Sequence, residues 1–300
     1  MIMRILITGA SGQLGTELVK ALATGKTVAG FLPSIYTDAE VDAVTHQALD
    51  IADRQAVDAW FAAHLPYDLV INAAAQTNVD GCEKAEAQAY RVNAHGPENL
   101  ALAVNRTGGK LIHVSTDYVF AGTEATPRSE NDPVCPVSAY GRTKLAGEKL
   151  ALDACPKTFV VRTAWLYGAE GKNFVKTMLR LARQNGVIKV VNDQWGSPTN
   201  AADLADAILR LAVTDQYGIY HAVNAGVCSW YDFACQIVQE KGVPCEKVPL
   251  TSSDYKAMFP ASADRPAYSV LSTQKLEAVT GHPMRSWQAA IDDFLATNEL

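Results

Sequence analysis

The amino-acid sequence predicts an α/β protein with a Rossmann-like, doubly wound parallel sheet and a smaller C-terminal α/β lobe. Apolar stretches without internal alternation, such as RILIT, DLVINAAA and KLIHVST, are separated by amphipathic stretches such as RQAVDAWFAAH and PENLALAVNRTG. Strands that are apolar on both faces and joined by helices are typical of a parallel sheet covered on both sides. From about residue 226 the pattern changes to helices and loops, which favours a C-terminal lobe.

The expected elements follow in chain order. RILIT is the first strand, and TELVKALA after it carries apolar residues at helical spacing. TVAGFL is the candidate second strand, and residues 31–48 look like an irregular connection. Later strands are expected in TFVVRTAWLYG, GVIKVV and GIYHAVNAG. In the Pro-rich loop ENDPVCPVSAYG, Ser138 is expected to cap the helix that follows.

Composition and charge exclude several classes of protein. With 48% hydrophobic and 19% charged residues, the 300-residue chain is typical of a soluble globular protein. A net charge of −6 argues against a broad nucleic-acid surface, which needs a basic excess. No apolar run reaches the roughly 18 residues of a membrane span, and the opening run is too short for a signal peptide. The 6 cysteines are scattered without a CxxC pair, so we expect reduced thiols in a cytoplasmic protein.

A glycine-rich segment, ITGASGQLGTEL, follows the first strand and opens the first helix. Gly9 would permit a tight turn, Gly12 would let the backbone approach a pyrophosphate, and Gly15 would let helix and strand pack closely. The N–H groups at the helix start would then hold the anion. Such a triplet can also be an ordinary tight turn, but its place between a strand and a helix predicts dinucleotide binding.

The choice between NADH and NADPH stays open at this point. The usual fingerprint has an acidic residue about 20 positions beyond the glycines, which binds the ribose 2′-OH and repels a 2′-phosphate. TVAGFL ends without an acid or an arginine, and Asp38 and Asp50 lie further on. The small residues at 73–75 end the next strand. Their small side chains either leave room for a ligand or let a helix pack closely on the sheet.

Polar residues at a later strand end complete a second part of the site. Ser115 and Thr116 end the strand LIHVST, and either could hydrogen-bond a carbonyl oxygen or cap the strand end. Tyr140 and Lys144 share one face of the next helix. A cation within about 4–6 Å would lower the pKa of a tyrosine from about 10, so that the tyrosine could deliver a proton to a carbonyl oxygen. Alternatively, Tyr140 and Lys144 are ordinary residues that share one side of a helix and have no catalytic role.

These motifs together resemble the extended short-chain dehydrogenase/reductase superfamily. More narrowly, GQLG, INAAAQTNVDGCE, STDYVFAG, YGRTK, RTAWLYG, NDQWGSPT and RPAYSVLS are similar to the dTDP-4-dehydrorhamnose reductase family, in the family's order and over nearly the whole chain. The resemblance implies NADPH- or NADH-dependent reduction of the C4 keto group of dTDP-4-dehydro-β-L-rhamnose to dTDP-β-L-rhamnose. This is the last step of dTDP-rhamnose synthesis, and so of a route to cell-surface polysaccharide.

The resemblance also implies residue roles. Tyr140 matches the proton donor, Lys144 the lysine that contacts the nicotinamide ribose, and Thr116 the residue that polarises the C4 carbonyl. The implied cofactor-binding residues are Gly9, Gly12, Gln13, Leu14, Gly15, Asp50, Ile51, Ala74, Ala75, Thr77, Tyr140 and Lys144. The implied substrate-binding residues are Thr116, Asp117, Trp165 and Arg265. Trp165 could instead be a core aromatic, and Arg265 an ordinary surface arginine in place of a fork for the diphosphate.

The implied organisation is a dinucleotide-binding domain at 1–165, with strands near 187–191 and 218–225 interleaved, and a substrate-binding lobe over most of 166–300. Some family members dimerise with Mg²⁺. No ligand set for a metal can be identified in this chain, which we expect to be a monomer or homodimer. The departures from the family are Ala121 before Gly122, where a more polar residue is common, and the irregular 31–48 segment.

Three alternatives remain. A nucleotide-sugar 4,6-dehydratase carries Asp-Glu after the threonine, whereas this chain has Asp117 and Tyr118. An epimerase would share Tyr140 and Lys144 but usually has a strand end of small residues. A non-catalytic binding subunit, similar to the regulatory beta subunit of methionine adenosyltransferase, would bind the cofactor within a partner complex. The substrate-segment motif NDQWGSPT favours the reductase.

Overall fold

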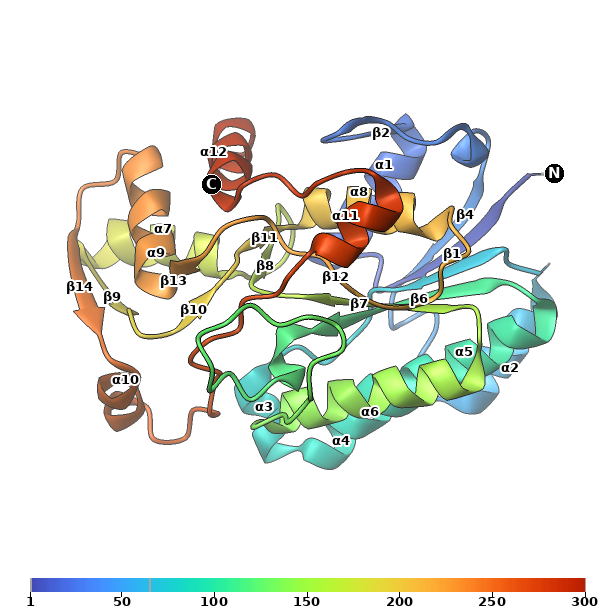
Figure 1. Cartoon of the computed structure of the whole chain (residues 1–300), viewed down its shortest axis with the longest axis horizontal. Helices are drawn as coiled ribbons and strands as arrows, with labels where there is room; N and C mark the ends of the chain where they lie inside the picture. Colours follow the sequence, from blue (N-terminus) through green and yellow to red (C-terminus); the bar gives the residue numbers. More distant parts are fainter. Residues whose placement is uncertain (1, 65, 300) are drawn as a thin grey trace.

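A central six-stranded parallel sheet organises the protein, as seen in a computed structural model that describes residues 2–64 and 66–299 (Figure 1). Its strand order is β12-β7-β6-β5-β1-β4. The strands are β1 (Arg4–Thr8), β4 (Glu40–Val44), β5 (Leu69–Asn72), β6 (Lys110–Thr116), β7 (Thr158–Thr163) and β12 (Gly218–His221). Because the chain starts in the middle and winds outward in both directions, the predicted doubly wound fold is confirmed.

Helices cover both faces of this sheet (Figure 1). On one face lie α1 (Gln13–Thr24), α8 (Ala201–Ala212) and α11 (Gln274–Thr280), which pack on Ile5, Ile7 and their neighbours. On the other lie α2 (Arg54–Ala63), α5 (Gly96–Thr107) and α6 (Ala139–Ala154), which pack around Leu6 and Val70. Successive strand residues therefore enter opposite cores, which explains the non-alternating apolar strands of the sequence.

The second strand of the sheet differs from the one predicted. Residues of TVAGFL form part of a small antiparallel hairpin, β2 (Lys26–Thr27) with β3 (Gly30–Phe31), outside the central sheet. Its Phe31 is 75% exposed, so this stretch has no buried face. The partner of β1 is β4, which lies inside the segment expected to be irregular. Since β4 is an edge strand and largely half-exposed, it lacks the apolar run by which the other strands were found.

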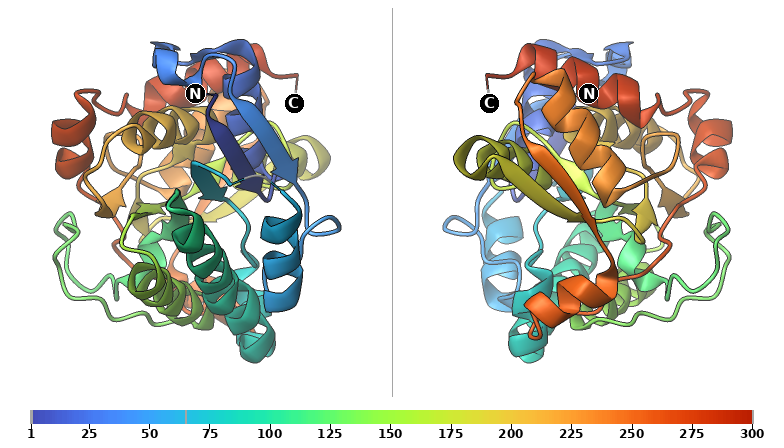
Figure 2. Two further views of the ribbon diagram at one scale, coloured as in Figure 1. Left: turned by 90° about the vertical axis from the view of Figure 1, so that its right-hand side faces the viewer. Right: turned by 90° about the vertical axis from the view of Figure 1, so that its left-hand side faces the viewer.

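A second core lies beyond the central sheet. It is built by α7 (Phe174–Asn185), α9 (Trp230–Glu240) and α12 (Trp287–Thr297), with the parallel pair β9 (Val187–Val191) and β14 (Glu246–Leu250). The end-on views place β14 and α9 at the opposite end of the molecule from β1 and β4 (Figure 2). The expectation that the strand near 187–191 is interleaved with the first domain is wrong, because β9 pairs with β14 in a separate sheet. The strand expected near 218–225 does lie in the central sheet, as β12.

Short elements complete the chain. These are α3 (Val79–Lys84), α4 (Glu86–Tyr90), α10 (Ser252–Met258), the pairs β8 (Leu166–Tyr167) with β11 (Thr199–Asn200) and β10 (Trp195–Gly196) with β13 (Cys228–Ser229), a π-turn at Arg91–His95, and 3₁₀ turns at Ser34–Tyr36 and Asp117–Val119. Within the described parts of the chain, no helix is both long and apolar enough to cross a membrane.

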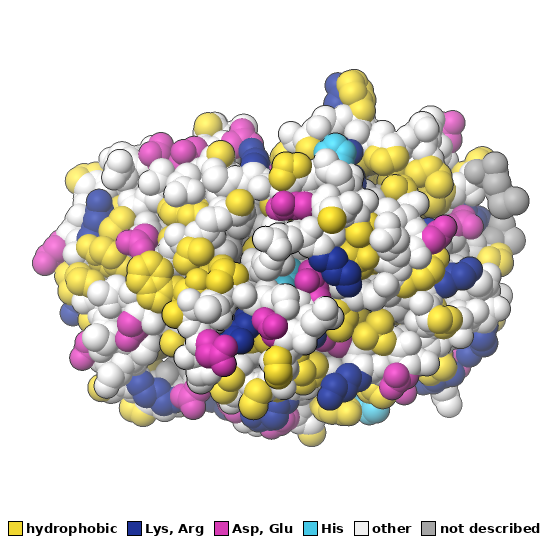
Figure 3. All heavy atoms as spheres, viewed as in Figure 1, with side chains coloured by type: hydrophobic (Ala, Val, Ile, Leu, Met, Phe, Trp, Pro, Cys, Tyr) yellow, Lys and Arg dark blue, Asp and Glu magenta, His cyan; other side chains and the backbone are white. Residues whose placement is uncertain are grey.

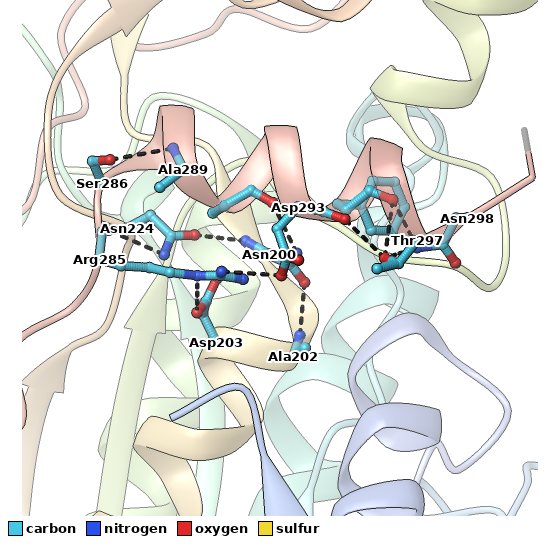
Figure 4. A network of polar contacts seen from close by, with 12 residues as sticks. Asn200, Ala202, Asp203, Asn224, Arg285, Ser286, Ala289, Asp293, Thr297 and Asn298 are labelled. Atoms are coloured by element: carbon cyan, nitrogen blue, oxygen red, sulfur yellow. Dashed lines mark hydrogen bonds and ion pairs between the residues drawn. The ribbon is translucent and has the colours of Figure 1, made fainter. Parts of the chain in front are cut away.

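A polar network ties α12 to α8 (Figure 4). Arg285 donates to Asp203 of α8 through Nε at 2.7 Å and to Asp293 of α12 through Nη1 at 3.1 Å. Asn224 accepts from the backbone N–H of Asn200 at 2.8 Å and donates to the Arg285 carbonyl at 3.3 Å. Burial raises the pKa of Asp203, and Arg285 counteracts that rise. The network therefore joins the second core to a helix of the central sheet.

Replacing Arg285 by Met should destabilise the fold by about 2–3 kcal/mol, because it leaves the Asp203 carboxylate, whose side chain is 5% exposed, without its cation. We expect a melting temperature several degrees lower in a thermal unfolding scan. Arg91→Met removes an exposed arginine and is the matched control. The double variant Arg285→Met/Asp203→Asn should recover much of the lost melting temperature. If it recovers none, the unpaired Asp203 carboxylate is not the cause of the destabilisation.

Candidate active site

A cavity of about 980 Å³ opens at the carboxyl edge of the central sheet. Its wall includes most of the residues that the sequence singled out: Gly9, Gly12, Gln13, Leu14, Asp50, Ile51, Ala74, Ala75, Thr77, Thr116, Asp117, Tyr140, Lys144 and Trp165. Gly15 and Arg265 are not in this wall. The structure also adds residues that were not predicted, among them His46, Tyr118, Lys172 and Trp230. The cavity lies where parallel α/β sheets bind ligands.

The glycine loop forms one end of the cavity. Gly9 has a positive φ of 71°, and a Cβ there would lie 2.8 Å from the backbone nitrogen of Ala74. A Cβ on Gly15 would overlap the carbonyl oxygen of Gly9, so Gly15 brings α1 against the loop and not against a ligand. Gly12 precedes α1 without a side-chain cap. The loop thus leaves open the space above the first N–H groups of α1, as a bound pyrophosphate requires.

Asp50 and Ile51 border the cavity beyond β4. The Asp50 carboxylate accepts from the backbone N–H of Ala52 at 3.0 Å and lies 3.7 Å from the His46 ring. Thr45 and His46, not an acid, directly follow β4. A carboxylate that would repel a 2′-phosphate is therefore not placed immediately after this strand.

Tyr140 and Lys144 come from the first turns of α6. Ser138 caps this helix as predicted, since its hydroxyl accepts from the Gly141 N–H at 3.1 Å. The Tyr140 ring packs edge-on against Tyr118, with 5.6 Å between centroids. Lys144 is 1% exposed, and its Nζ donates to the Val114 carbonyl at 2.6 Å. Both residues border the cavity, where Tyr140 is half-buried and Lys144 is buried.

The expected lowering of the tyrosine pKa is not found in the structure. Burial raises the pKa of Tyr140, and the neighbouring Thr116 hydroxyl counteracts this in part. Burial also lowers the pKa of Lys144 to about 8, against a smaller opposing effect of Glu148. The Lys144 amine has other partners: its Nζ donates to the Val114 carbonyl and lies 3.5 Å from His113 Nε2.

Thr116 and Asp117 form the centre of the site. The Thr116 hydroxyl donates to Asp117 at 2.9 Å and accepts from the Tyr118 N–H at 3.2 Å, so it also caps the turn after β6. Ser115 also borders the cavity, and its hydroxyl donates to the Glu148 carboxylate. Burial raises the pKa of Asp117 to about 6, with hydrogen bonds from Ser269 and Thr116 opposing the rise. Among the residues that the structure describes, Asp117 Oδ2 has no hydrogen-bond partner.

Trp165 covers the cavity from the side of the second core. Its backbone is left-handed, with a φ of 48°, which is unusual and costly for a residue with a side chain. The indole stacks on that of Trp230, with centroids 3.5 Å apart and planes 9° from parallel. Gly196 lies so close that a Cβ would overlap the Trp165 ring. Trp230 is the first residue of α9 and lies within the Ser229–Asp232 capping box, and no motif in the sequence predicts that it reaches the site.

Arg265 lies in the wall of a second cavity of about 660 Å³, which α7, β9 and α10 enclose with mainly apolar side chains. Its guanidinium pairs with Asp80 at 3.1 Å. Trp230 belongs to the walls of both cavities, so the two are neighbours. Over the described residues, no group of three or more His, Cys, Asp or Glu side chains is placed to hold a metal ion.

Asp117→Asn should make the protein more stable at pH 7.5. A carboxyl whose pKa is raised by folding favours the folded state while protonated, so stability falls as pH rises from about 4 to about 6. The shift corresponds to a cost on the order of 2–3 kcal/mol at neutral pH, which Asn does not incur. Melting temperatures at pH 4.5 and 7.5 test this, with the exposed Asp153→Asn as control. If the melting temperatures at pH 4.5 and 7.5 differ by the same amount in Asp117→Asn as in the wild type, the prediction is wrong.

Comparison with known proteins agrees with this geometry. The family model described as RmlD substrate binding domain matches residues 3–299. The dTDP-4-dehydrorhamnose reductase of Mycobacterium tuberculosis is 43% identical over 98% of this chain and 92% of its own. A probable dTDP-4,6-dihydroxy-2-methyloxan-3-one 4-ketoreductase of Streptomyces antibioticus is 43% identical over 96% and 93%.

Solved structures agree as well. The crystal structure of dTDP-4-dehydrorhamnose reductase from Bacillus anthracis in complex with NADP has a TM-score of 0.90 and 36% identity. It covers 99% of this chain, which in turn covers 100% of that one. The resemblance found in the sequence motifs is thereby confirmed. With a family model that spans almost its whole length and relatives this similar over nearly all of theirs, the chain belongs to the dTDP-4-dehydrorhamnose reductase family.

Proposed function

We propose that this protein reduces the C4 keto group of dTDP-4-dehydro-β-L-rhamnose to give dTDP-β-L-rhamnose, with NADPH or NADH as reductant. One observation carries the proposal: Tyr140, Thr116 and Lys144 border the same cavity as Gly9 and Gly12 of the glycine loop. A proton donor, a carbonyl-binding hydroxyl and a dinucleotide-type loop are the parts that carbonyl reduction needs. Family membership supports the same activity.

The residues present fit a nicotinamide dinucleotide. Gly9 and Gly12 leave room for the pyrophosphate at the start of α1, where Gln13 and Leu14 also border the cavity. The remaining wall toward the adenosine and nicotinamide ends is formed by Asp50, Ile51, Ala74, Ala75 and Thr77. When bound, the cofactor supplies the hydride for C4.

In this mechanism the protein's own groups handle the proton. Thr116 hydrogen-bonds the C4 carbonyl oxygen and holds it near the Tyr140 hydroxyl. Tyr140 donates its proton to that oxygen as the carbon is reduced. Lys144, one helical turn further on, then returns a proton to Tyr140. Since Asp117 adjoins Thr116 and its Oδ2 has no hydrogen-bond partner among the described residues, it is suited to bind a sugar hydroxyl.

We further propose that residues 166–300 act mostly as the substrate-binding lobe and residues 1–165 as the dinucleotide-binding domain. The sugar would lie under Trp165, and the nucleotide end would extend past Trp230 toward the second cavity. Arg265 would there bind the diphosphate, and the apolar side chains of α7 would receive the base. The cytoplasmic location, the monomeric or homodimeric state and any use of Mg²⁺ stay predictions.

A second candidate substrate is another dTDP-4-keto sugar. The Streptomyces antibioticus relative, whose name describes reduction of a different dTDP-linked ketone, is as similar to this chain as the M. tuberculosis reductase. Either substrate calls for the same use of Tyr140 and Thr116. The two candidate substrates differ in the sugar ring, which would lie under Trp165.

The test is an absorbance assay at 340 nm with dTDP-4-dehydro-β-L-rhamnose and either NADPH or NADH. We expect substrate-dependent oxidation of the cofactor, and the two rates give the preference. No oxidation by a sample that binds NADPH would contradict the proposed substrate, and turnover of a different dTDP-4-keto sugar would favour the second candidate.

Tyr140→Phe should lower kcat by about 10²–10⁴-fold, since it removes the proton donor but keeps the ring that packs on Tyr118. NADPH affinity, measured by fluorescence titration, should change little. Tyr231→Phe removes a hydroxyl from the other core and serves as control. A Tyr140→Phe enzyme with near-normal kcat would remove Tyr140 from the mechanism.

Arg265→Met should raise KM for the nucleotide sugar roughly 10-fold or more, because a charge-assisted contact with the diphosphate is lost. The KM for NADPH should stay the same, since Arg265 is outside the first cavity's wall. Lys256→Met, a neighbouring exposed cation that pairs with Asp264, is the matched control. Equal effects of the two variants would show that Arg265 contributes only general charge.

A further inference from the structure

Behind Lys144 runs a buried chain of hydrogen bonds that the mechanism above does not use. Thr8 donates to Asn72 Oδ1 at 2.8 Å, Asn72 Nδ2 lies 3.2 Å from His113 Nδ1, and His113 Nε2 lies 3.5 Å from Lys144 Nζ. All four side chains are 0–1% exposed. The chain runs from the end of β1 through β5 and β6 to α6, directly beneath the candidate active site.

The position of the proton on His113 follows from this geometry. The backbone N–H of Ala74 meets Asn72 at 3.2 Å, and since an N–H can only donate, the atom it meets must be the carbonyl oxygen. The NH₂ group of Asn72 therefore faces His113 and donates to Nδ1. A ring whose Nδ1 accepts carries its proton on Nε2 and is neutral. Burial, with the nearby Lys144 charge, also lowers the pKa of His113 well below its usual value.

The Nε2–H group of His113 consequently points toward Lys144. An ammonium group offers three donors and no acceptor, whereas a neutral amine has a lone pair that can accept from this N–H. The other contact of Lys144, the Val114 carbonyl, accepts from either form. The arrangement therefore favours the neutral amine over the ammonium ion.

The other titratable groups around Lys144 act differently. On α6, Tyr140 lies one turn before it, and Glu148, one turn after it, raises its pKa. Glu148 is, however, held by two hydrogen bonds from Arg162 of β7, at 2.7 and 2.9 Å, and by Ser115. Asp117 follows β6 and bonds Thr116. Of these groups, His113 alone is placed by the described contacts with an N–H directed at Nζ.

We propose that His113 is a positioning residue for Lys144: held by Thr8 and Asn72, it presents an N–H group that stabilises the neutral amine formed each time Lys144 returns a proton to Tyr140. This rests on the proposed role of Lys144. In the step, an N–H bond of Lys144 breaks, a phenol O–H bond forms on Tyr140, and the lone pair left on Nζ accepts from His113 Nε2. A proton from solvent restores the ammonium ion.

The first measurement needs no turnover. Nitrogen-15 NMR of the histidine rings in the wild-type protein should show His113 as a neutral ring with its proton on Nε2 from pH 6 to pH 9. In Asn72→Asp, a carboxylate oxygen faces Nδ1 and should move the proton to Nδ1. A wild-type ring that is charged, or protonated on Nδ1, overturns the proposal even if the reductase activity is confirmed.

The second measurement is the pH dependence of kcat. Activity falls at alkaline pH as Lys144 loses the proton it must supply. Because the His113 N–H lowers that pKa, His113→Leu should move the alkaline limb up by about one pH unit and lower kcat about 10-fold, with KM for NADPH nearly unchanged. An alkaline limb that stays at its wild-type pH in a His113→Leu enzyme that binds NADPH overturns the proposal.

His221→Leu is the matched control. His221 is equally buried, but its Nδ1 faces the Arg128 carbonyl on the far edge of the sheet. His221→Leu should leave the alkaline limb of the kcat profile at its wild-type pH. If His221→Leu and His113→Leu displace that limb equally, the proposal is overturned. If His113→Leu does not fold, the tautomer of the wild-type ring decides alone. If no substrate is turned over, the proposed function fails, while the NMR result still reports on the hydrogen-bond chain.

Discussion

The buried ion pair between Glu148 and Arg162 is the interaction on which the site depends. Glu148 lies on α6 and Arg162 on β7, their side chains are 1% and 2% exposed, and two hydrogen bonds join them. Ser115 of β6 bonds the same carboxylate. These contacts thus fix the position of α6 against β6 and β7, and α6 is the helix on which Tyr140 and Lys144 lie. An isolated charge at this depth would be very costly, so each partner requires the other.

The same burial shapes the chemistry of the cavity. For Tyr140, Lys144 and Asp117 alike, burial is the main cause of the pKa shift. Burial thus makes the charged form of each group less favourable than it is in water. On the face shown in Figure 3, charged and apolar side chains are mixed, and apolar groups gather over the second core.

The sequence predicts the parts of this protein whose cause is local. The glycine loop, the Ser138 cap and the strand end at Thr116 depend on a few adjacent residues, and the structure has each of them. The β4 edge strand and the pairing of β9 with β14 depend on which distant segment supplies a partner, which the pattern of one strand does not contain. Likewise, Trp230 is placed by the packing of the second core, and Arg265 by its ion pair with the distant Asp80 of α3. The direction of the Lys144 amine is decided by Val114 and His113, not by its spacing from Tyr140.

The stacked indoles of Trp165 and Trp230 give the protein a built-in optical reporter. Trp165 follows β7 of the central sheet and Trp230 begins α9 of the second core, so their stack joins the two bodies of the protein. Two indoles 3.5 Å apart and nearly parallel couple their electronic transitions, and the strength of the coupling depends steeply on separation and angle. The near-ultraviolet circular dichroism of the unlabelled protein therefore records how the second core is seated on the sheet.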